Sequence, residues 1–199
     1  YQNTFFEYLN ELQSKGLQVF VTSHSPTITA KSDVNNISIL QRKQSIIQSF
    51  SFDELSEDDY PKESKRHLRK FLDTTKAQLF FANGVLLVEG VAEAIIIPIL
   101  AKKFLTEKID LCKSGIELVN IGGVAFNHFG LLFNNDDERK RLLSKCAIIT
   151  DSDPKDNGDI SDRAQKAKDL EKHNLKVCLA THTLEHDLFE QSERNKAIM

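Results

Sequence analysis

The chain has 199 residues, of which 40% are hydrophobic and 28% charged, with a formal net charge of −3. This composition suits one domain, or one domain and part of another, and excludes both a wholly disordered chain and a general electrostatic attraction to nucleic acid. No apolar run approaches the ~20 residues that cross a bilayer and no signal peptide is visible, while three cysteines without a CxxC pair fit a reducing cytoplasm.

The N-terminal part of the chain predicts a helix, a strand and a hairpin. Residues 4–16 carry apolar side chains at helical spacing and end in a glycine. LQVFVTSHSP, residues 17–26, predicts a short buried strand that ends at a turn, and residues 37–52 predict a hairpin. The acidic residues 51–61 predict a linker or exposed turn. Because the chain begins inside a helical pattern and without methionine, we expect it to be a fragment.

The rest of the chain predicts a parallel sheet. A basic helix is expected over residues 62–81. Four strand patterns follow, at 84–90, 116–123, 146–153 and 175–183, separated by helix patterns at 91–105, 126–145 and 160–173. This alternation predicts an α/β fold with a four-stranded parallel sheet, right-handed crossovers and flanking helices. In such sheets, ligands bind at the carboxyl ends of the strands.

Acidic residues or glycines follow every one of these four strands. They are Glu89, Gly122, Gly123, Asp151, Asp153, Glu185 and Asp187, and Glu93 lies one helical turn after Glu89. Any single carboxylate is more simply explained as a helix cap or a solvated residue. Several carboxylates at one edge need cations to offset their repulsion, and hard oxygen ligands suit Mg²⁺ or Mn²⁺. The glycines permit close backbone approach of a ligand, although a plain turn explains them nearly as well.

Two motifs in this region resemble those of a known domain. LLVEGVAEAIIIPILA and IITDSD resemble the glutamate and DxD motifs of the Toprim domain, a metal-dependent catalytic module of topoisomerases, primases and some nucleases. The longer string HLRKFLDTTKAQLFFANGVLLVEGVAEAIIIP is similar to the start of the Toprim domain in the OLD (overcoming lysogenisation defect) family of ATP-dependent endonucleases. The resemblance covers about residues 62–190, and it implies a Rossmann-like Toprim nuclease domain over residues 62–199, truncated at its C-terminus.

A downstream segment resembles the same family. THTLEHDLF matches its later acidic motif at Thr183, Leu184, Glu185, Asp187 and Leu188. OLD nucleases also use a lysine beyond this motif. Lys196 stands too close to the motif for a confident match, so the catalytic set is expected to be incomplete.

The N-terminal part resembles a different module. QVFVTSHSPTI is similar to the switch region of ABC-type ATPases, in which a histidine after a core strand approaches the γ-phosphate; His24 holds that position. OLD proteins place such an ATPase before the Toprim domain, so residues 1–61 are interpreted as the C-terminal part of an ABC-type ATPase domain. No GxxxxGK[ST] phosphate loop occurs in the chain. ATP binding, and a homo-oligomer formed through the ATPase, are therefore expected of the full-length protein.

The resemblance implies hydrolysis of DNA phosphodiester bonds by two divalent ions, Mg²⁺ or Mn²⁺, in an ATP-regulated nuclease of phage defence. The expected metal ligands are Glu89, Glu93, Asp151, Asp153, Glu185 and Asp187. Among them, Glu89, Asp151 and Asp153 are the expected catalytic residues. Asp151 would bridge the two ions or hold the more deeply bound one. Glu89 is a metal ligand or, alternatively, the general acid or base, and the sequence leaves both roles open.

Other interpretations of the same residues remain. The chain could be a DNA-docking or assembly module without activity, in which the basic run at 65–70 contacts phosphates, although a solvated helix face explains that run as well. HTLEH, residues 182–186, fits the inverted zinc-protease motif, but no third ligand is evident. DSD at 151–153 fits a phosphatase of the haloacid dehalogenase type. Lys155 departs from that pattern, and it also breaks the spacing of a calcium loop.

Overall fold

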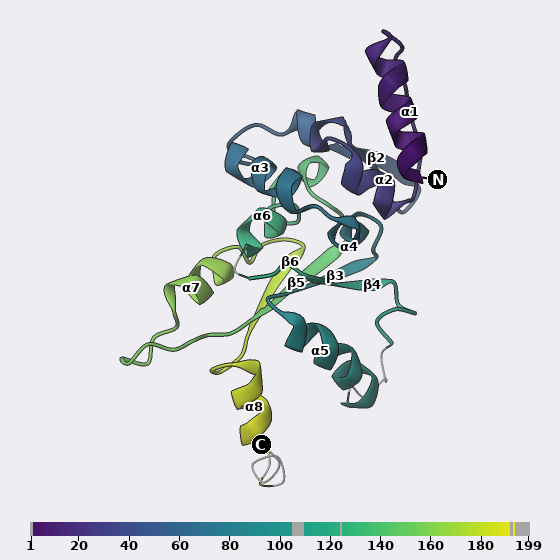
Figure 1. Cartoon of the computed structure of the whole chain (residues 1–199). Coiled ribbons are helices and arrows are strands. Elements are labelled where there is room, and N and C mark those ends of the chain that lie inside the picture. Colours follow the sequence, from purple (N-terminus) through teal and green to yellow (C-terminus); the bar gives the residue numbers. More distant parts are fainter. Residues whose placement is uncertain (1, 105–109, 124, 192, 194–199) are drawn as a thin grey trace.

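The computed structural model describes residues 2–104, 110–123, 125–191 and 193 (Figure 1). The first elements are α1 (Gln2–Ser14), α2 (Pro26–Lys31), β1 (Ser38–Lys43) and β2 (Ile46–Ser51). They are followed by α3 (Lys62–Phe71), α4 (Thr74–Ala77), β3 (Gly84–Val88), α5 (Val91–Phe104), β4 (Ile116–Asn120), α6 (Phe126–Gly130), β5 (Lys145–Thr150), α7 (Asp162–Lys168), β6 (Leu175–Leu179) and α8 (Leu184–Glu190). Short 3-10 turns lie at Val34–Asn36, Phe52–Glu54, Gln78–Phe80 and Glu138–Lys140.

Strands β3 to β6 form one parallel sheet in the order β4-β3-β5-β6. The last residue of β3, Val88, pairs with Asn120 of β4 and with Ile149 of β5. Each crossover between strands contains a helix, and Figure 1 shows α5 on one side of the sheet and α4 and α6 on the other. This arrangement confirms the predicted α/β fold, and it places the carboxyl ends of all four strands along one edge.

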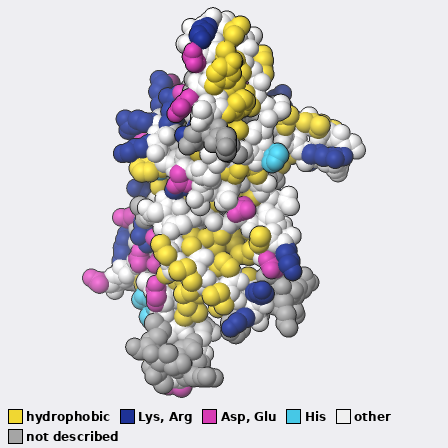
Figure 2. Space-filling view, turned by 45° about the vertical axis from the view of Figure 1, so that its right-hand side comes forward, with side chains coloured by type: hydrophobic (Ala, Val, Ile, Leu, Met, Phe, Trp, Pro, Cys, Tyr) yellow, Lys and Arg dark blue, Asp and Glu magenta, His cyan; other side chains and the backbone are white. Residues whose placement is uncertain are grey.

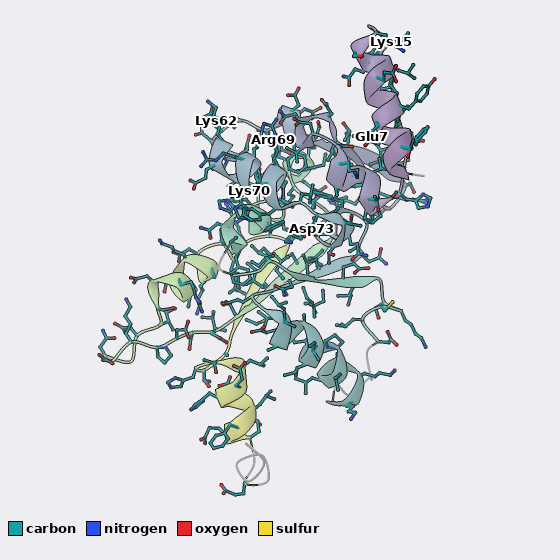
Figure 3. The ribbon with its side chains drawn as sticks, viewed as in Figure 1. Glu7, Lys15, Lys62, Arg69, Lys70 and Asp73 are labelled. Atoms are coloured by element: carbon teal, nitrogen blue, oxygen red, sulfur yellow. The ribbon has the colours of Figure 1, made fainter. Side chains whose placement is uncertain are left out.

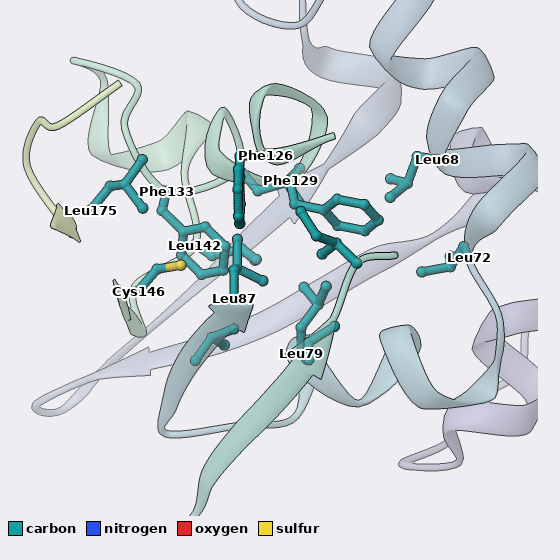
Figure 4. Close-up of a cluster of buried hydrophobic side chains, with 14 of the residues drawn as sticks. Leu68, Leu72, Leu79, Leu87, Phe126, Phe129, Phe133, Leu142, Cys146 and Leu175 are labelled. Carbon is teal, nitrogen blue, oxygen red and sulfur yellow. The ribbon is translucent and has the colours of Figure 1, made fainter. Parts of the chain in front are cut away.

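The main hydrophobic core lies between the sheet and α6 (Figure 4). Phe129 and Phe133, in and just after α6, are fully buried, as are Leu87 of β3 and Leu175 of β6. A Cβ atom at Gly130 would lie 3.1 Å from a methyl group of Leu175, so the absence of a side chain there lets α6 approach the sheet. Burial of these large apolar side chains is the main stabilising contribution to the fold.

Residues before position 61 also contribute to this core. Phe50 and Phe52 are fully buried, and the rings of Phe52 and Tyr60 meet edge to face at 5.9 Å. The hairpin is tied to the sheet region by Gln41, whose side chain bonds the carbonyl of Arg141 at 3.2 Å. The prediction of a linker or exposed turn over residues 51–61 is therefore wrong for the apolar residues Phe52, Leu55 and Tyr60, which are buried, whereas most of the acidic residues between them are exposed. The domain boundary at residue 61 stays a prediction.

The predicted strand at residues 17–26 is also wrong. Residues 17–25 have no strand pairing among the described residues, and Phe20 is 84% exposed. An apolar, β-branched sequence forms a strand only where a neighbouring strand accepts its backbone hydrogen bonds, and the described chain places none beside it. The hairpin predicted at 37–52 is confirmed by β1 and β2, which pair antiparallel.

Two predicted helices are shorter or divided. The helix expected over residues 62–81 divides at Asp73, whose carboxylate accepts a hydrogen bond from the N–H of Lys76 at 2.8 Å and starts α4. The helix expected over 126–145 is reduced to α6 and a 3-10 turn that Asp137 caps. Capping by aspartate competes with helix continuation in both places.

The helix α5 presents an exposed apolar stripe. Val91, Ile95 and Ile99 are 65%, 60% and 49% exposed and recur every four residues, so they lie along one side of the helix. Figure 2 shows hydrophobic side chains gathered on the lower half of this face of the molecule. Within the described residues, no helix is long and apolar enough to cross a membrane.

Candidate metal centre

The neighbouring strands β3 and β5 bring two of the predicted carboxylates together. Glu89 directly follows β3, and Asp151 directly follows β5. The hydroxyl of Thr150, the last residue of β5, donates a short hydrogen bond to Oε1 of Glu89. The N–H of Asp151 points to the same oxygen at 3.4 Å. The position of Glu89 is therefore set by groups from the adjacent strand.

Asp151 is partly buried beside other negative charges. Its Oδ1 accepts a hydrogen bond from the N–H of Leu184, at the start of α8, at 3.0 Å. Burial raises the pKa of Asp151 to about 6; the Leu184 N–H opposes this rise, and the charges of Glu89, Asp153 and Glu93 add to it. A cation bound here would favour the ionised form, since it would offset both the burial and the repulsion.

The serine between the two aspartates fixes the loop that carries them. Ser152 is 4% exposed, and its hydroxyl donates to the carbonyl of Thr181 at 2.6 Å. Its N–H donates to the carbonyl of His182 at 3.1 Å. These bonds attach the DxD turn to the loop between β6 and α8. The next residue, Asp153, has φ of +39°, a region that residues other than glycine rarely adopt.

An arginine that the sequence analysis did not single out lies between two of the carboxylates. Arg163, in α7, has its Nη2 3.3 Å from Oε1 of Glu89 and forms a short ion pair with Asp153. Its Nε is buried and has no hydrogen-bond partner among the described residues. The guanidinium therefore links the end of β3 to the loop after β5.

Glu93 lies on the first turn of α5 and is 9% exposed. A Cβ atom at Gly90 would lie 3.1 Å from Oε2 of Glu93, so the glycine between the two glutamates leaves room for this carboxylate. Glu93 and Asp151 line a small pocket of about 180 Å³ with residues of β5, β6 and α8. The chemistry of this edge, with several carboxylate oxygens and few nitrogen ligands, fits a hard divalent cation.

The two acids predicted on α8 have different surroundings. Glu185 is exposed on the first turn of the helix. Asp187 accepts hydrogen bonds from the hydroxyl and the N–H of Thr181, the latter at 2.8 Å, and these bonds hold its pKa below the usual range. Asp187 thus closes the loop between β6 and α8. Metal binding by either residue stays a prediction.

The two predicted glycines shape the loop after β4. Gly122 and Gly123 have φ of +68° and +119°, so both adopt a backbone that favours glycine. The N–H of Gly123 donates to the carbonyl of Glu89 at 2.9 Å, which holds this loop against the end of β3. A Cβ atom at either glycine would meet nothing within 4 Å, so space beside the carboxylates is open.

Within residues 2–104, 110–123, 125–191 and 193, no three His, Cys, Asp or Glu side chains form a group that could hold a metal ion. The contacts above explain this: Arg163 lies against Glu89 and Asp153, while Asp151 faces the N–H of Leu184. The donor set suits a divalent cation, but its present arrangement would have to change for three oxygens to surround one.

The structure also gives the surroundings of the histidines singled out in the sequence. The rings of His182 and His186 lie 4.5 Å apart on the surface, and the described residues offer them no third ligand. His24 is exposed and directly precedes Ser25, the N-cap of α2, and Figure 1 shows α2 far from α8. Lys196 lies outside the described residues.

Some residues of the basic run on α3 have partners within the protein. Lys65 donates to the carbonyl oxygens of Phe52 and Leu55, at 2.7 and 3.3 Å. Arg69 forms an ion pair of 2.9 Å with Asp33, and His67 is half-buried. Figure 3 shows Lys62, Arg69 and Lys70 along this helix. Phosphate contact by this run stays a prediction, beside the alternative of a solvated helix face.

Comparison with known proteins identifies the region that contains this edge. Residues 80–153 match the family model described as overcoming lysogenization defect protein-like, TOPRIM domain. Over 149 residues, the chain is 27% identical to the Old nuclease of Escherichia phage P2. That alignment covers 74% of this chain and 25% of the phage protein, so the chain spans about a quarter of the length of this relative.

Two solved structures are also similar in part. Both are of the C-terminal region of the OLD protein of Xanthomonas campestris pv. campestris, one phased with iodine and one with platinum. They are 26% and 28% identical to this chain, with TM-scores of 0.38 and 0.39. They cover 55% and 56% of this chain, and the aligned parts are 57% and 56% of those chains. From the family model, residues 80–153 are an OLD-like Toprim domain, and the chain is similar to the Old nuclease of Escherichia phage P2.

Proposed function

We propose that this chain supplies the metal-dependent catalytic site of a DNA endonuclease. The observation that carries the proposal is the convergence of Glu89, Asp151 and Asp153 at the carboxyl ends of two neighbouring strands. The resemblance to a relative named Old nuclease supports the choice of reaction. Divalent ions, Mg²⁺ or Mn²⁺, would supply charge stabilisation at the phosphate and an activated water at neutral pH.

The residues of the chain have distinct roles in this proposal. Thr150 and the N–H of Asp151 hold Oε1 of Glu89 toward the strand edge, which favours a ligand role for Glu89 over that of a mobile acid or base. Asp151 would be the shared ligand, because burial and the charges of three neighbouring carboxylates oppose its ionised form, which a cation would favour. Glu93 and Asp153 would supply further oxygen donors.

The loops around the carboxylates suit a phosphate backbone. The open space at Gly122 and Gly123 would admit a phosphate close to the end of β3. The buried Ser152 keeps the DxD turn attached to the neighbouring loop, so the ligands would keep their positions when substrate binds.

We also propose that ATP regulates the whole protein through residues 1–61 and that the protein assembles through its ATPase. The supporting observation is the exposed segment at residues 17–21, which has a strand-like sequence and lies beside His24. Such a segment would suit a strand of a larger ATPase sheet. A role in phage defence follows the same family resemblance and is part of this proposal.

The test of the nuclease proposal is Asp151→Asn in the full-length protein. Removal of one negative charge from the shared ligand should lower Mn²⁺-dependent nicking of plasmid DNA by about 100-fold or more, since it weakens every ion that Asp151 contacts. Asp156→Asn is the matched control, because Asp156 is an exposed residue of the same loop. Nicking at the wild-type rate by the Asp151 variant, at saturating Mn²⁺, would refute the assignment.

A docking module without activity is the second candidate, favoured by the basic residues Arg66 and Lys70, which are exposed on α3. Its signature would be DNA binding that persists when EDTA removes divalent ions and that falls steeply with salt. DNA binding that disappears with EDTA would instead support the carboxylate site.

A further inference from the structure

Arg163 occupies a position that a divalent cation would otherwise be expected to take. Its guanidinium contacts Glu89, at the end of β3, and Asp153, in the loop after β5. These are two of the four acids that the proposed function assigns to the metals. Arg163 also lies beyond residues 80–153, the part of the chain that the Toprim family model covers.

The backbone around Arg163 fixes its position relative to the carboxylates. The N–H of Ser161, the N-cap of α7, donates to the carbonyl of Ser152 at 2.9 Å. The Ser161 hydroxyl in turn accepts a hydrogen bond from the N–H of Ala164, which is fully buried. The start of α7 is therefore attached to the DxD turn, and the Arg163 side chain stays within reach of the carboxylates.

The charge of Arg163 is suited to neutralise two carboxylates without a metal. An arginine stays protonated at any physiological pH, and Nη2 of Arg163 lies beside one oxygen of Glu89 and one oxygen of Asp153. A divalent cation placed between Glu89 and Asp153 would meet the guanidinium as a like charge. The two cations therefore exclude each other from these oxygens.

The guanidinium of Arg163 lies close enough to solvent to move away from Glu89 and Asp153. Its side chain is 34% exposed and that of Asp153 is 43% exposed, so the pair borders solvent. Its Nε is buried without a partner among the described residues, so its present position leaves one donor unsatisfied, which has a cost. A rotation of the side chain toward solvent would release Glu89 and Asp153 and give Nε access to water.

We propose that Arg163 is a tethered cation that competes with the divalent ion for Glu89 and Asp153. The inference rests on the proposed metal site and adds its regulation. Without a divalent ion, Arg163 keeps the two carboxylates together and limits their repulsion. When the ion binds, Arg163 turns away, so the affinity for the metal is set by the exchange of one cation for another.

The test is Mn²⁺ titration of this chain by isothermal calorimetry, with Arg163→Gln. Loss of the competing charge should lower the Kd for Mn²⁺ by about tenfold. This change in binding free energy is about as large as the contribution of a partly exposed ion pair with favourable geometry. The same variant should melt at a lower temperature than wild type in EDTA, and Mn²⁺ should reverse that difference. Arg139→Gln is the matched control, because Arg139 pairs with Asp137 on the surface, and its Kd should stay at the wild-type value.

Arg163→Lys provides a second variant, which keeps a positive charge but places it on a more strongly hydrated ammonium group. Its Kd for Mn²⁺ should lie between those of wild type and Arg163→Gln, so the proposal stays testable if the glutamine variant fails to fold. Equal or weaker Mn²⁺ binding in both variants, with binding still lost in Asp151→Asn, would overturn the competition and leave the proposed function intact. Absence of Mn²⁺ binding in wild type and variants alike would overturn both.

Discussion

Two segments of this chain have closely similar sequences and different structures. VFVTSHSP, residues 19–26, and AIITDSDP, residues 147–154, each place four apolar or β-branched residues before a polar turn and a proline. The second segment forms β5 and its turn, paired on one side with β3 and on the other with β6. The first forms no strand within the described residues and exposes Phe20.

The difference shows that a strand-like sequence fixes the residues at its end only when neighbouring segments contact it. In the second segment, Glu89 from β3 and the loop after β6 set the positions of Thr150, Asp151 and Ser152. Around the first, the described chain supplies no comparable neighbour, so His24 remains exposed. The local sequence provides the tendency to extend, and the adjacent strands provide the geometry.

The largest contrast should appear in the stability of the two regions. Phe129→Ala removes a fully buried ring from the core beside β5, and should lower the free energy of unfolding by about 3–5 kcal/mol. Phe20→Ala removes a ring that is 84% exposed, and should change it by less than about 0.5 kcal/mol. Urea denaturation of both variants measures the contrast. A loss in Phe20→Ala as large as that in Phe129→Ala would show that residues 17–25 are packed in solution.

The sequence predicted the sheet well because its strands read as short apolar runs that alternate with helix patterns. It also predicted that Glu89, Asp151 and Asp153 follow strands whose carboxyl ends lie along one edge of the sheet. Their role as metal ligands stays a prediction. Arg163 was missed because its partners are distant in sequence and surface arginines on helices are common. The burial of Phe52 and Tyr60 was not predicted, because the many acidic residues of 51–61 are typical of an exposed segment.

A smaller difference between the two segments should appear in how the melting temperature depends on pH. The folded-state pKa of Asp151, raised to about 6, lies above its ordinary value of 3.8, so the folded protein binds the proton more tightly than the unfolded chain. This tighter binding of the proton stabilises the folded protein fully below about pH 4, and the stabilisation is lost as the pH rises through about 6. In EDTA, Asp151→Asn should therefore melt above wild type at pH 7.5, and the difference should shrink toward zero near pH 4.

The control for this effect is again Asp156→Asn, which removes the same charge from an exposed position. His24→Asn probes the other segment, and its melting temperature should follow wild type across the same pH range. A difference between Asp151→Asn and wild type that stays constant from pH 4 to 7.5 would show that Asp151 titrates normally in the folded protein.

The most direct test of the central claim is the thermal stabilisation of this chain by Mn²⁺. Carboxylates gathered at one strand edge should bind the ion, and binding should raise the melting temperature by mass action. The account predicts a shift at millimolar Mn²⁺ that is lost in Asp151→Asn and retained in His182→Ala. Loss of the shift in the histidine variant, together with a normal shift in the aspartate variant, would contradict it.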